Sequence, residues 1–503
     1  MKPSKVSSDS DFDFRSAIAS FATAGKIPVK FIGTASSHFQ DDPAAFGEAH
    51  GPKSDWEAEV YNNLSGLPAY VSPSCIKGKQ KRADLPRFTA QSREYVDRAT
   101  ALGISMFRTS FDWARLCPRA GQFDLRLVEF YMRLCVDLRL RGIEPLICLN
   151  HFTMPLWLCG LNSSGRATIG AWEHRDVLTH FRYFVEQVST HISNPDLVRT
   201  VARQAGADTA TQDKLVGQGL VRYWMTFNEP IMVPIQGYVA GCSPPFKHLR
   251  LALAWQIMRK MVEAHDIAYH ELKHVTSGFE GRESRIGVGY NWQYWDGPLG
   301  GLVHTLINEL LYANLFEGNG QQSDFVGLHY YFRQTAGFHS RHGREYGDHP
   351  GFGDIYPAGI RTVLAKMHRA YPTKSIVVSE IGFADGSKRR GIPTDQRRPF
   401  WLLETVRHIL AAVADGIPVE AVLSWTLVDS FEWHYGMQVP FGLMTLDDLH
   451  RPLPEPGPTI RSFEVWKAVA AALRQPTPAN AAHLQSCYQA SREQYTAHRS
   501  IYG

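Results

Sequence analysis

Short apolar segments of β-prone residues alternate along this chain with longer segments of helical periodicity. The segments with strand character are residues 31–36, 104–109, 145–150, 223–227, 285–290, 324–330, 375–379 and 421–427. Helix spacing is found between most of them, at residues 127–141, 176–191, 251–274 and 399–415. Such alternation predicts parallel strands joined by right-handed crossovers. Eight units of this kind predict an α/β fold, a single (β/α)8 TIM barrel with extended loops at the carboxyl-end face of the strands.

Several segments fall outside this repeat. Residues 1–25 form a polar lead-in, residues 26–474 contain the barrel, and residues 475–503 are a polar tail with few apolar positions. The polar stretch 194–219 is expected to be a surface excursion. Residues 336–354, rich in His, Gly and Arg, follow the sixth predicted strand and are expected to form a loop over the mouth of the barrel.

Composition narrows the class of protein. A hydrophobic fraction of 44% and twelve Trp among 503 residues are sufficient for a large core and favour a globular enzyme over a disordered chain. The formal charge of +4 is too weak to predict binding to nucleic acid. Composition leaves the oligomeric state open.

The cysteines and the apolar runs bear on the compartment. The seven cysteines form no Cys-x-x-Cys motif, which favours a reducing compartment without structural zinc. The chain does not open with a signal-peptide pattern, and its longest apolar runs are far shorter than the roughly 20 residues of a spanning helix, so no transmembrane segment is expected. The expectation is a cytoplasmic protein. No His/carboxylate cluster has ligand spacing, and the sequence indicates no cofactor.

Two glutamates mark the carboxyl ends of predicted strands. Glu229 lies in Thr-Phe-Asn-Glu-Pro at residues 226–230, and Glu380 lies in Val-Ser-Glu-Ile-Gly at residues 378–382. In a parallel barrel the catalytic groups collect at these strand ends. Two carboxyl groups from different strands suit a reaction that needs a proton donor and a nucleophile or base, and cleavage of a glycosidic bond uses such a pair most often.

Polar and aromatic side chains stand at most of the other predicted strand ends. A sugar pocket requires this combination, because hydroxyls need planar hydrogen-bonding partners and the apolar face of the sugar needs an aromatic platform. In chain order these residues are Gln40, Arg108, Asn150 and His151, Asn228, His329 with Tyr330 and Tyr331, Trp425, and then Glu432 and Trp433 in the following loop.

The ordered set of motifs resembles glycoside hydrolase family 1, the retaining β-glycosidases, over roughly residues 27–472. Any one motif is weak, but their order on successive strands is specific. The matching segments are residues 31–40, 107–115, 150–158, 226–230, 324–331, 354–357, 378–385, 425–433 and 441–443.

The resemblance implies catalytic roles. It makes Glu229 the general acid/base and Glu380 the nucleophile, with Arg108 and Tyr331 in positions that support the ionised nucleophile and Asn228 on the sugar 2-hydroxyl. The physical requirements agree, since burial would keep a proton on Glu229 while a cation and a phenol would stabilise the Glu380 carboxylate.

The resemblance also implies a sugar-binding set. Gln40, His151 and Glu432 match residues that grip sugar hydroxyls, with Glu432 accepting from the 4- and 6-hydroxyls. Trp425 and Trp433 match the stacking wall and the residue over the non-reducing end. His329 and Phe441 belong to the same expected pocket, Phe441 through its place in the matching segment 441–443.

Three positions depart from the family pattern. Ile381 follows the nucleophile where the family usually has Asn, His329 replaces the Asn of an Asn-Tyr-Tyr motif, and Phe152 replaces a Trp. His329 is equally compatible with a structural role and with tuning of the site. If it were protonated, it would add an acid-side pH dependence.

The sequence therefore predicts a retaining exo-β-glycosidase of β-glucosidase type, acting on small-molecule β-glucosides, β-galactosides or β-fucosides. A transglycosidase is the alternative within enzymes, because residues 354–356 and 397–399 resemble the galactolipid-remodelling branch of the family. An alternative of another class is a non-catalytic sugar-binding barrel, which would retain the pocket and lose a carboxylate. Both carboxylates are present.

Overall fold

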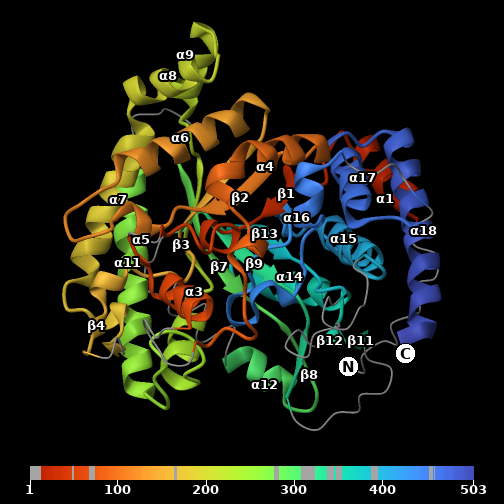
Figure 1. Cartoon of the computed structure of the whole chain (residues 1–503). Helices are drawn as coiled ribbons and strands as arrows, with labels where there is room; N and C mark the ends of the chain where they lie inside the picture. Colours follow the sequence, from red (N-terminus) through yellow and green to blue (C-terminus); the bar gives the residue numbers. More distant parts are fainter. Residues whose placement is uncertain are drawn as a thin grey trace.

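Eight parallel strands close into a barrel in the computed structural model (Figure 1). They are β1 (Phe31–Ala35), β2 (Met106–Ser110), β3 (Glu144–Asn150), β6 (Tyr223–Asn228), β7 (Arg285–Asn291), β9 (Phe325–Tyr330), β13 (Ser375–Ile381) and β14 (Val419–Trp425). Their order around the barrel is β1-β14-β13-β9-β7-β6-β3-β2. The predicted (β/α)8 barrel is confirmed. The structure describes residues 13–47, 50–66, 74–163, 167–276, 283–306, 323–336, 345–346, 354–386, 395–452, 457 and 459–502.

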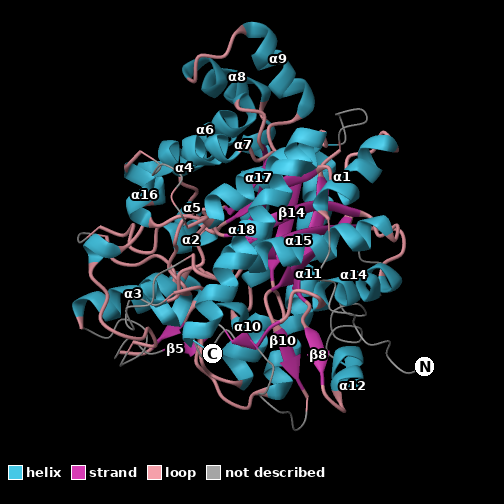
Figure 2. Ribbon diagram, turned by 90° about the vertical axis from the view of Figure 1, so that its right-hand side faces the viewer, coloured by secondary structure: helices cyan, strands magenta, loops and turns pink. Residues whose placement is uncertain are grey.

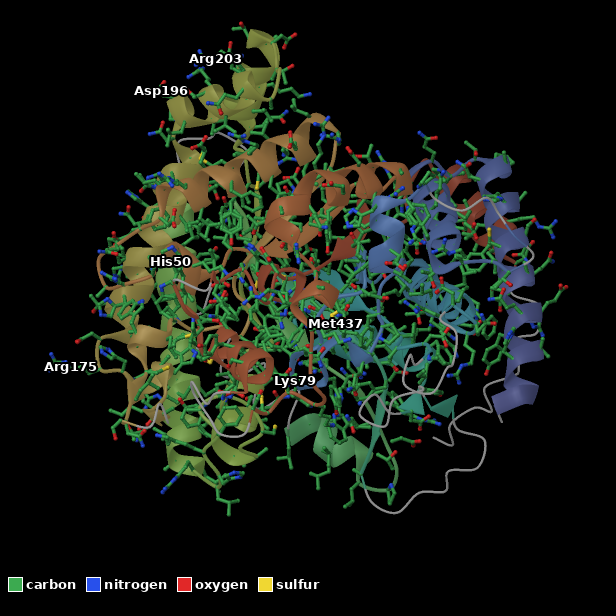
Figure 3. All side chains as sticks on the ribbon, in the orientation of Figure 1. His50, Lys79, Arg175, Asp196, Arg203 and Met437 are labelled. Atoms are coloured by element: carbon green, nitrogen blue, oxygen red, sulfur yellow. The ribbon has the colours of Figure 1, made fainter. Side chains whose placement is uncertain are left out.

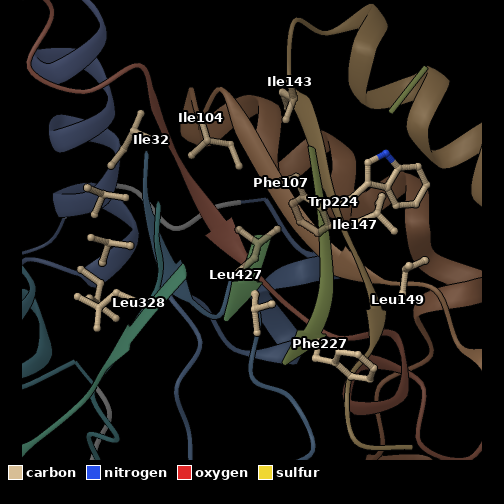
Figure 4. Close-up of a cluster of buried hydrophobic side chains, with 14 of the residues drawn as sticks. Ile32, Ile104, Phe107, Ile143, Ile147, Leu149, Trp224, Phe227, Leu328 and Leu427 are labelled. Atoms are coloured by element: carbon tan, nitrogen blue, oxygen red, sulfur yellow. The ribbon is translucent and has the colours of Figure 1, made fainter. Parts of the chain in front are cut away.

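Side chains alternate between two layers along each strand. Met106, Leu146 and Met225 belong to a buried cluster inside the barrel. Their neighbours Phe107 and Ile147 belong to the larger cluster between the strands and the outer helices (Figure 4). Both faces of each strand are therefore buried, which explains why these strands are continuous apolar runs in the sequence.

An outer layer of helices covers the barrel. These are α4 (Phe88–Leu102), α6 (Leu125–Leu140), α7 (Val177–Ser193), α11 (Leu251–Thr276), α14 (Gly359–Ala370), α15 (Arg398–Ala414) and α17 (Ser462–Arg474). Local signals fix their ends. Asp124 accepts hydrogen bonds from the N–H groups of Arg126 and Leu127 at the start of α6, and Gly103 ends α4 in the left-handed conformation.

The polar stretch 194–219 forms two helices, α8 (Pro195–Gln204) and α9 (Thr209–Gln218). They lie at one end of the molecule in two perpendicular views (Figures 1 and 2). Asp196 and Arg203 lie on α8 at this end (Figure 3). Asn194 caps α8 and Asp208 caps α9. The expected surface excursion is therefore helical.

The two ends of the described chain also form helices. α1 (Phe14–Thr23) lies in the polar lead-in, and α18 (Pro478–Tyr502) spans most of the polar tail. The two pack together, since the Phe14 ring lies 5.4 Å from that of Tyr488 and the Phe14 N–H donates to Gln485 at 2.8 Å.

Elements that follow the barrel strands lie at the end opposite α8 and α9 (Figures 1 and 2). They include β4 (Gly160–Leu161), β5 (Ala167–Ile169), α10 (Met232–Pro234), η4 (Ile235–Val239), β8 (Tyr294–Asp296) and α12 (Gly300–His304). Of the expected loop 336–354, residues 337–344 and 347–353 lie outside the described residues. Its remainder includes strand β11 (Glu345–Tyr346), which pairs with β12 (Asp354–Ile355).

Two further observations concern compartment and chemistry. Across the described ranges, every helix is too short or too polar to cross a membrane. The seven cysteines, all within the described ranges, form no disulfide with one another.

Candidate active site

Four neighbouring strand ends carry an arc of side chains, in which His329 and Asn291 both contact Glu229. β13 supplies Glu380, β9 supplies His329, β7 ends at Asn291, and Glu229 directly follows β6. Nδ1 of His329 lies 2.8 Å from Oε1 of Glu229 and 3.5 Å from Oε2 of Glu380. Asn291 Nδ2 donates to Oε2 of Glu229 at 3.0 Å. The barrel order alone brings these residues together.

The two carboxyl groups lie close enough for one sugar carbon to contact both. A carboxylate oxygen of Glu229, one of Glu380 and a ring nitrogen of His329 all lie within 4.8 Å of one another. Carboxyl groups about 5–5.5 Å apart are typical of retaining glycosidases, whereas inverting enzymes need roughly 6.5–9.5 Å. Hydrogen bonds within this cluster and the Arg108 cation on Glu380 account for the spacing, so no metal is assigned to it.

Two side chains hold Glu380 in place. Arg108, fully buried on β2, forms an ion pair with Oε1 of Glu380. The Tyr331 hydroxyl donates to Oε2 of Glu380 at 2.5 Å. Arg108 also donates through Nη2 to Oδ1 of Asn228 at 2.5 Å, which orients that amide. Charge-assisted hydrogen bonds of this kind are strong and fix the orientation of the carboxylate.

The electrostatic environments of the arc residues differ. Burial raises the pKa of Glu229 to about 7, although the Asn291 hydrogen bond and the Arg108 charge act in the opposite direction. Burial lowers the pKa of His329 to about 3, with Glu380 opposing and Arg108 reinforcing the shift. His329 is therefore neutral at physiological pH. The expected acid-side pH dependence requires a protonated His329, and at physiological pH the ring is not protonated.

A cavity of about 290 Å³ opens over the arc. Every residue expected in the catalytic and sugar-binding sets lines it except Arg108 and His329, which contact Glu380 and Glu229 from behind. Asn150 and Tyr330, also expected at the strand ends, do not line it, and they donate instead to the backbone carbonyls of Thr153 and Tyr356. Gln40 Nε2 donates to Oε2 of Glu432 at 3.2 Å on the opposite wall. Burial, with the charges of Glu380 and Glu229, raises the pKa of Glu432 to about 8, while hydrogen bonds from Trp425 and Gln40 act to lower it.

Aromatic rings form one side of the cavity. The imidazole of His151 is stacked with both Trp425 and Trp433, with ring centroids 5.7 and 5.9 Å away. Phe152 contacts Trp433 edge-on at 5.1 Å. Phe441 meets the Tyr331 ring at 5.7 Å, close to Glu380.

Backbone strain is concentrated at this site. Glu229, Trp433 and Phe152 all adopt positive φ, at 42°, 47° and 71°, which non-glycine residues rarely do. Such conformations persist where the surrounding structure requires the side chain to point in one direction. Here all three side chains face the cavity.

Two residues of the site were missed in the sequence. Asn291 ends β7, one residue beyond the predicted end of the fifth strand, and a strand-end search extended by one residue would have found it. Asp55 lines the cavity with its carboxylate held by the N–H groups of Trp56 and Met154. Burial raises the pKa of Asp55 to about 7. Its sequence context, the start of the short helix α3 (Asp55–Ser65), carries no catalytic signal.

Two proteins are similar to this chain over most of its length. The galactolipid galactosyltransferase SFR2 of Arabidopsis thaliana is 25% identical over 396 residues, which cover 73% of this chain and 55% of that protein. The 1,4-beta-D-glucan glucohydrolase of Thermotoga neapolitana is 22% identical over 398 residues, 71% of this chain and 84% of that protein. The chain thus spans only about half the length of the SFR2 relative.

Solved structures have the same fold. The family 1 β-glucosidase of Thermotoga maritima superposes with a TM-score of 0.68 at 19% identity, covering 88% of this chain and 97% of that one. Other structures of that enzyme contain cyclophellitol or deoxynojirimycin. The sequence profile of glycosyl hydrolase family 1 matches residues 87–202, 216–302 and 321–455, which is most of the chain. The chain belongs to glycosyl hydrolase family 1.

Proposed function

We propose that this protein is a retaining exo-β-glycosidase that hydrolyses terminal β-D-glucosyl residues, or the related β-galactosyl or β-fucosyl residues. The observation that carries the proposal is the approach of the Glu229 and Glu380 carboxylate oxygens to within 4.8 Å. This spacing favours double displacement over single displacement. The presence of both acids also argues against a barrel that only binds sugar.

Glu380 is the proposed nucleophile. Its oxygen attacks the anomeric carbon while Glu229 transfers a proton to the glycosidic oxygen, so the carbon–oxygen bond to the aglycone breaks and a glycosyl ester forms on Glu380. Arg108 and Tyr331 fix the Glu380 carboxylate, and each bonds a different oxygen of it. A Glu229 pKa of about 7 supplies the proton near neutral pH.

The second step reverses the role of Glu229. Once Glu380 is esterified its negative charge is removed, and Glu229, which has released its proton, accepts one from water as the water attacks the anomeric carbon. The neutral ring of His329 is in contact with Glu229 Oε1 throughout and provides a hydrogen-bonding partner for it.

Sugar recognition is assigned to the opposite wall of the cavity. Gln40 and Glu432 form a hydrogen-bonded pair that faces sugar hydroxyls, and Trp425 and Trp433 supply the aromatic surface. The oxygen of the Asn228 amide accepts from Arg108, and its nitrogen is the proposed donor to the 2-hydroxyl. Hydrogen bonds at this hydroxyl strengthen in the transition state of glycoside hydrolysis.

Transglycosylation is a second candidate with its own support. The similar Arabidopsis protein is named a galactolipid galactosyltransferase. The part of the cavity wall that follows β6 includes the apolar side chains of Met232, Val233 and Tyr238, which suit an apolar acceptor. The first half-reaction is shared with hydrolysis, and only the acceptor that attacks the glycosyl ester differs.

A mechanism-based label tests the proposal. Incubation with activated 2-deoxy-2-fluoro-β-glucosides and galactosides is expected to add one glycosyl mass to the intact protein, with the adduct on the peptide that contains Glu380. The Glu380→Gln variant is the matched control and should remain unlabelled. Absence of an adduct with every sugar tested, or an adduct on another residue, contradicts the assignment.

A further inference from the structure

Large apolar side chains are exposed on one sector of the barrel mouth. Leu249 is 80% exposed, Leu251 66% and Trp255 45%, and Ile169 and Ile235 are exposed beside them. They belong to the segments that follow β3 and β6, which are adjacent strands of the barrel. We call these five side chains the apolar rim. Exposed apolar residues are ordinary when scattered, but a group of them marks an interaction surface.

Backbone hydrogen bonds bring the rim residues together. The chain before α11 folds back on η4, because the N–H of Lys247 donates to Gly237 at 2.8 Å and that of Leu249 donates to Val239 at 3.0 Å. Leu249 and Leu251 share a shallow hollow with Thr168 of β5, the neighbour of Ile169. These contacts place the segments that carry the rim residues next to one another.

Positive charge accompanies the rim. Residues 230–262 contain four Lys or Arg and no Asp or Glu. Lys247 is paired with Glu173, and Lys260 donates to backbone carbonyls at Trp172 and His174. Arg250 and Arg259 are exposed, one on each side of Trp255 in the sequence. Apolar and Trp side chains flanked by exposed arginines are the composition of surfaces that bind anionic lipid.

The rim continues into the active-site cavity. Met232, Gln236 and Tyr238, from the segment that contains Ile235, line the cavity that also contains Glu229. β5 and α10 lie at the end of the molecule away from α8 and α9 (Figure 2). A surface docked on the rim would therefore lie next to the opening through which a substrate enters.

We propose that the apolar rim docks this protein on the surface of an anionic lipid bilayer. Leu249, Leu251 and Trp255 insert among the headgroups, and Arg250 and Arg259 contact anionic phosphates. The substrate class in this proposal rests on the proposed glycosidase function. The substrate is a membrane-embedded β-glycoside, whose sugar reaches Glu380 while its apolar aglycone stays near the rim. Trp and Leu are suited to this position because they gain from burial at the boundary between headgroup and acyl chain.

Vesicle co-sedimentation of the full chain tests the docking. The wild type is expected to bind phosphatidylcholine vesicles that contain phosphatidylglycerol and to bind pure phosphatidylcholine much less. The Leu249→Ser/Leu251→Ser/Trp255→Ser variant should lose about tenfold or more in partition coefficient. The matched control is Ile27→Ser/Leu197→Ser, which removes exposed apolar side chains from other parts of the surface and should bind like the wild type.

The charge contribution is tested separately. Arg250→Glu/Arg259→Glu should weaken binding to the anionic vesicles by roughly tenfold or more, since each basic residue near such a surface contributes about 1 kcal/mol. Added salt should weaken wild-type binding in the same direction. Wild-type binding that is absent, indifferent to phosphatidylglycerol, or equally lost in the control variant overturns the proposal. Loss of self-association in the rim variant without any vesicle binding also overturns it, in favour of a contact between copies.

Activity assays separate this proposal from the proposed function. The rim variants should hydrolyse a water-soluble aryl β-glycoside at the wild-type rate and should lose at least severalfold activity toward a β-glycolipid presented in anionic vesicles. Equal loss on both substrates means that the rim acts through the fold and not through docking, which overturns the proposal. Vesicle binding by a protein that cleaves no glycoside would leave the docking surface intact and contradict only the enzymatic assignment.

Discussion

His329 and Glu229 contact each other through Nδ1 and Oε1 at 2.8 Å, with the imidazole fully buried. Nε2 of the same ring has no hydrogen-bonding partner among the described residues. A buried N–H without an acceptor is costly, so the proton of the neutral ring belongs on Nδ1, where Glu229 accepts it. His329 therefore stabilises the ionised form of Glu229 and opposes the effect of burial on its pKa.

Removing this donor should shift the pH profile. In His329→Phe the pKa of Glu229 should rise further, which moves the alkaline limb of kcat/KM from near pH 7 to higher pH by roughly one unit. The measurement uses a phenyl or alkyl β-glucoside whose leaving group requires protonation. His329→Asn retains an N–H donor and should show a smaller shift. An unchanged alkaline limb in His329→Phe would contradict the hydrogen bond inferred here.

Stability should depend on pH through Glu229. Its pKa is raised from 4.5 to about 7 on folding, so the unfolded chain ionises first as pH rises. The folded state loses stability between pH 4.5 and 7 by up to roughly 3 kcal/mol, and below pH 4.5 the group contributes no difference. Glu229→Gln should therefore have a higher Tm than the wild type at pH 8 and a gain close to zero at pH 4. Glu129→Gln, at an exposed carboxylate, is the control, and an equal gain at both pH values would refute the expectation.

The roles of the two acids can be separated by azide rescue. In Glu380→Gly, azide should occupy the nucleophile's place and give an α-glycosyl azide from an activated β-glycoside. In Glu229→Gly, the Glu380 ester still forms, and azide should attack it to give the β product. Product anomers are read by NMR. The same anomer from both variants would refute the assignment of nucleophile and acid/base.

Sugar recognition at Glu432 can be tested by removing one hydroxyl. Glu432→Gln should lower kcat/KM for phenyl β-glucoside by roughly tenfold to a hundredfold, the range expected for loss of hydrogen bonds to a carboxyl group. The loss should be smaller for the 6-deoxy analogue, which lacks one of the hydroxyls assigned to this residue. Equal losses on both substrates would show that Glu432 does not contact the 6-hydroxyl.

Much of the barrel was predictable because its strands are buried on both faces. Each predicted strand overlaps an observed one, since a continuous apolar run bounded by turns has few other structures available. α18 was not predicted as a helix. Its buried face includes Ala481, Leu484, Cys487, Tyr488 and Ser491. Because three of these residues are small or polar, the face does not show as a helical pattern of apolar residues in the sequence.

The site was predictable where a strand end carries a distinctive side chain. Glu229, Glu380 and Arg108 meet because parallel strands deliver their carboxyl ends to one face. The contact of His329 with Glu229 was not predictable, because proximity at one face does not specify which carboxylate a ring nitrogen reaches. Asp55 comes from a loop and a short helix, and only tertiary structure brings it to the cavity.

Glu380 lies on β13 and Glu229 follows β6, so two strands, β9 with His329 and β7 with Asn291, lie between the two acids around the barrel. No loop sets the distance between them. A slip of β9 by one residue would turn His329 into the helix layer and bring Leu328 or Tyr330 inward. Insertions in the surrounding connections can therefore diversify the aglycones or acceptors admitted during evolution. Under the proposed mechanism the anomeric configuration of the product would be inherited unchanged, because the spacing of the two acids is set by the order of the barrel strands.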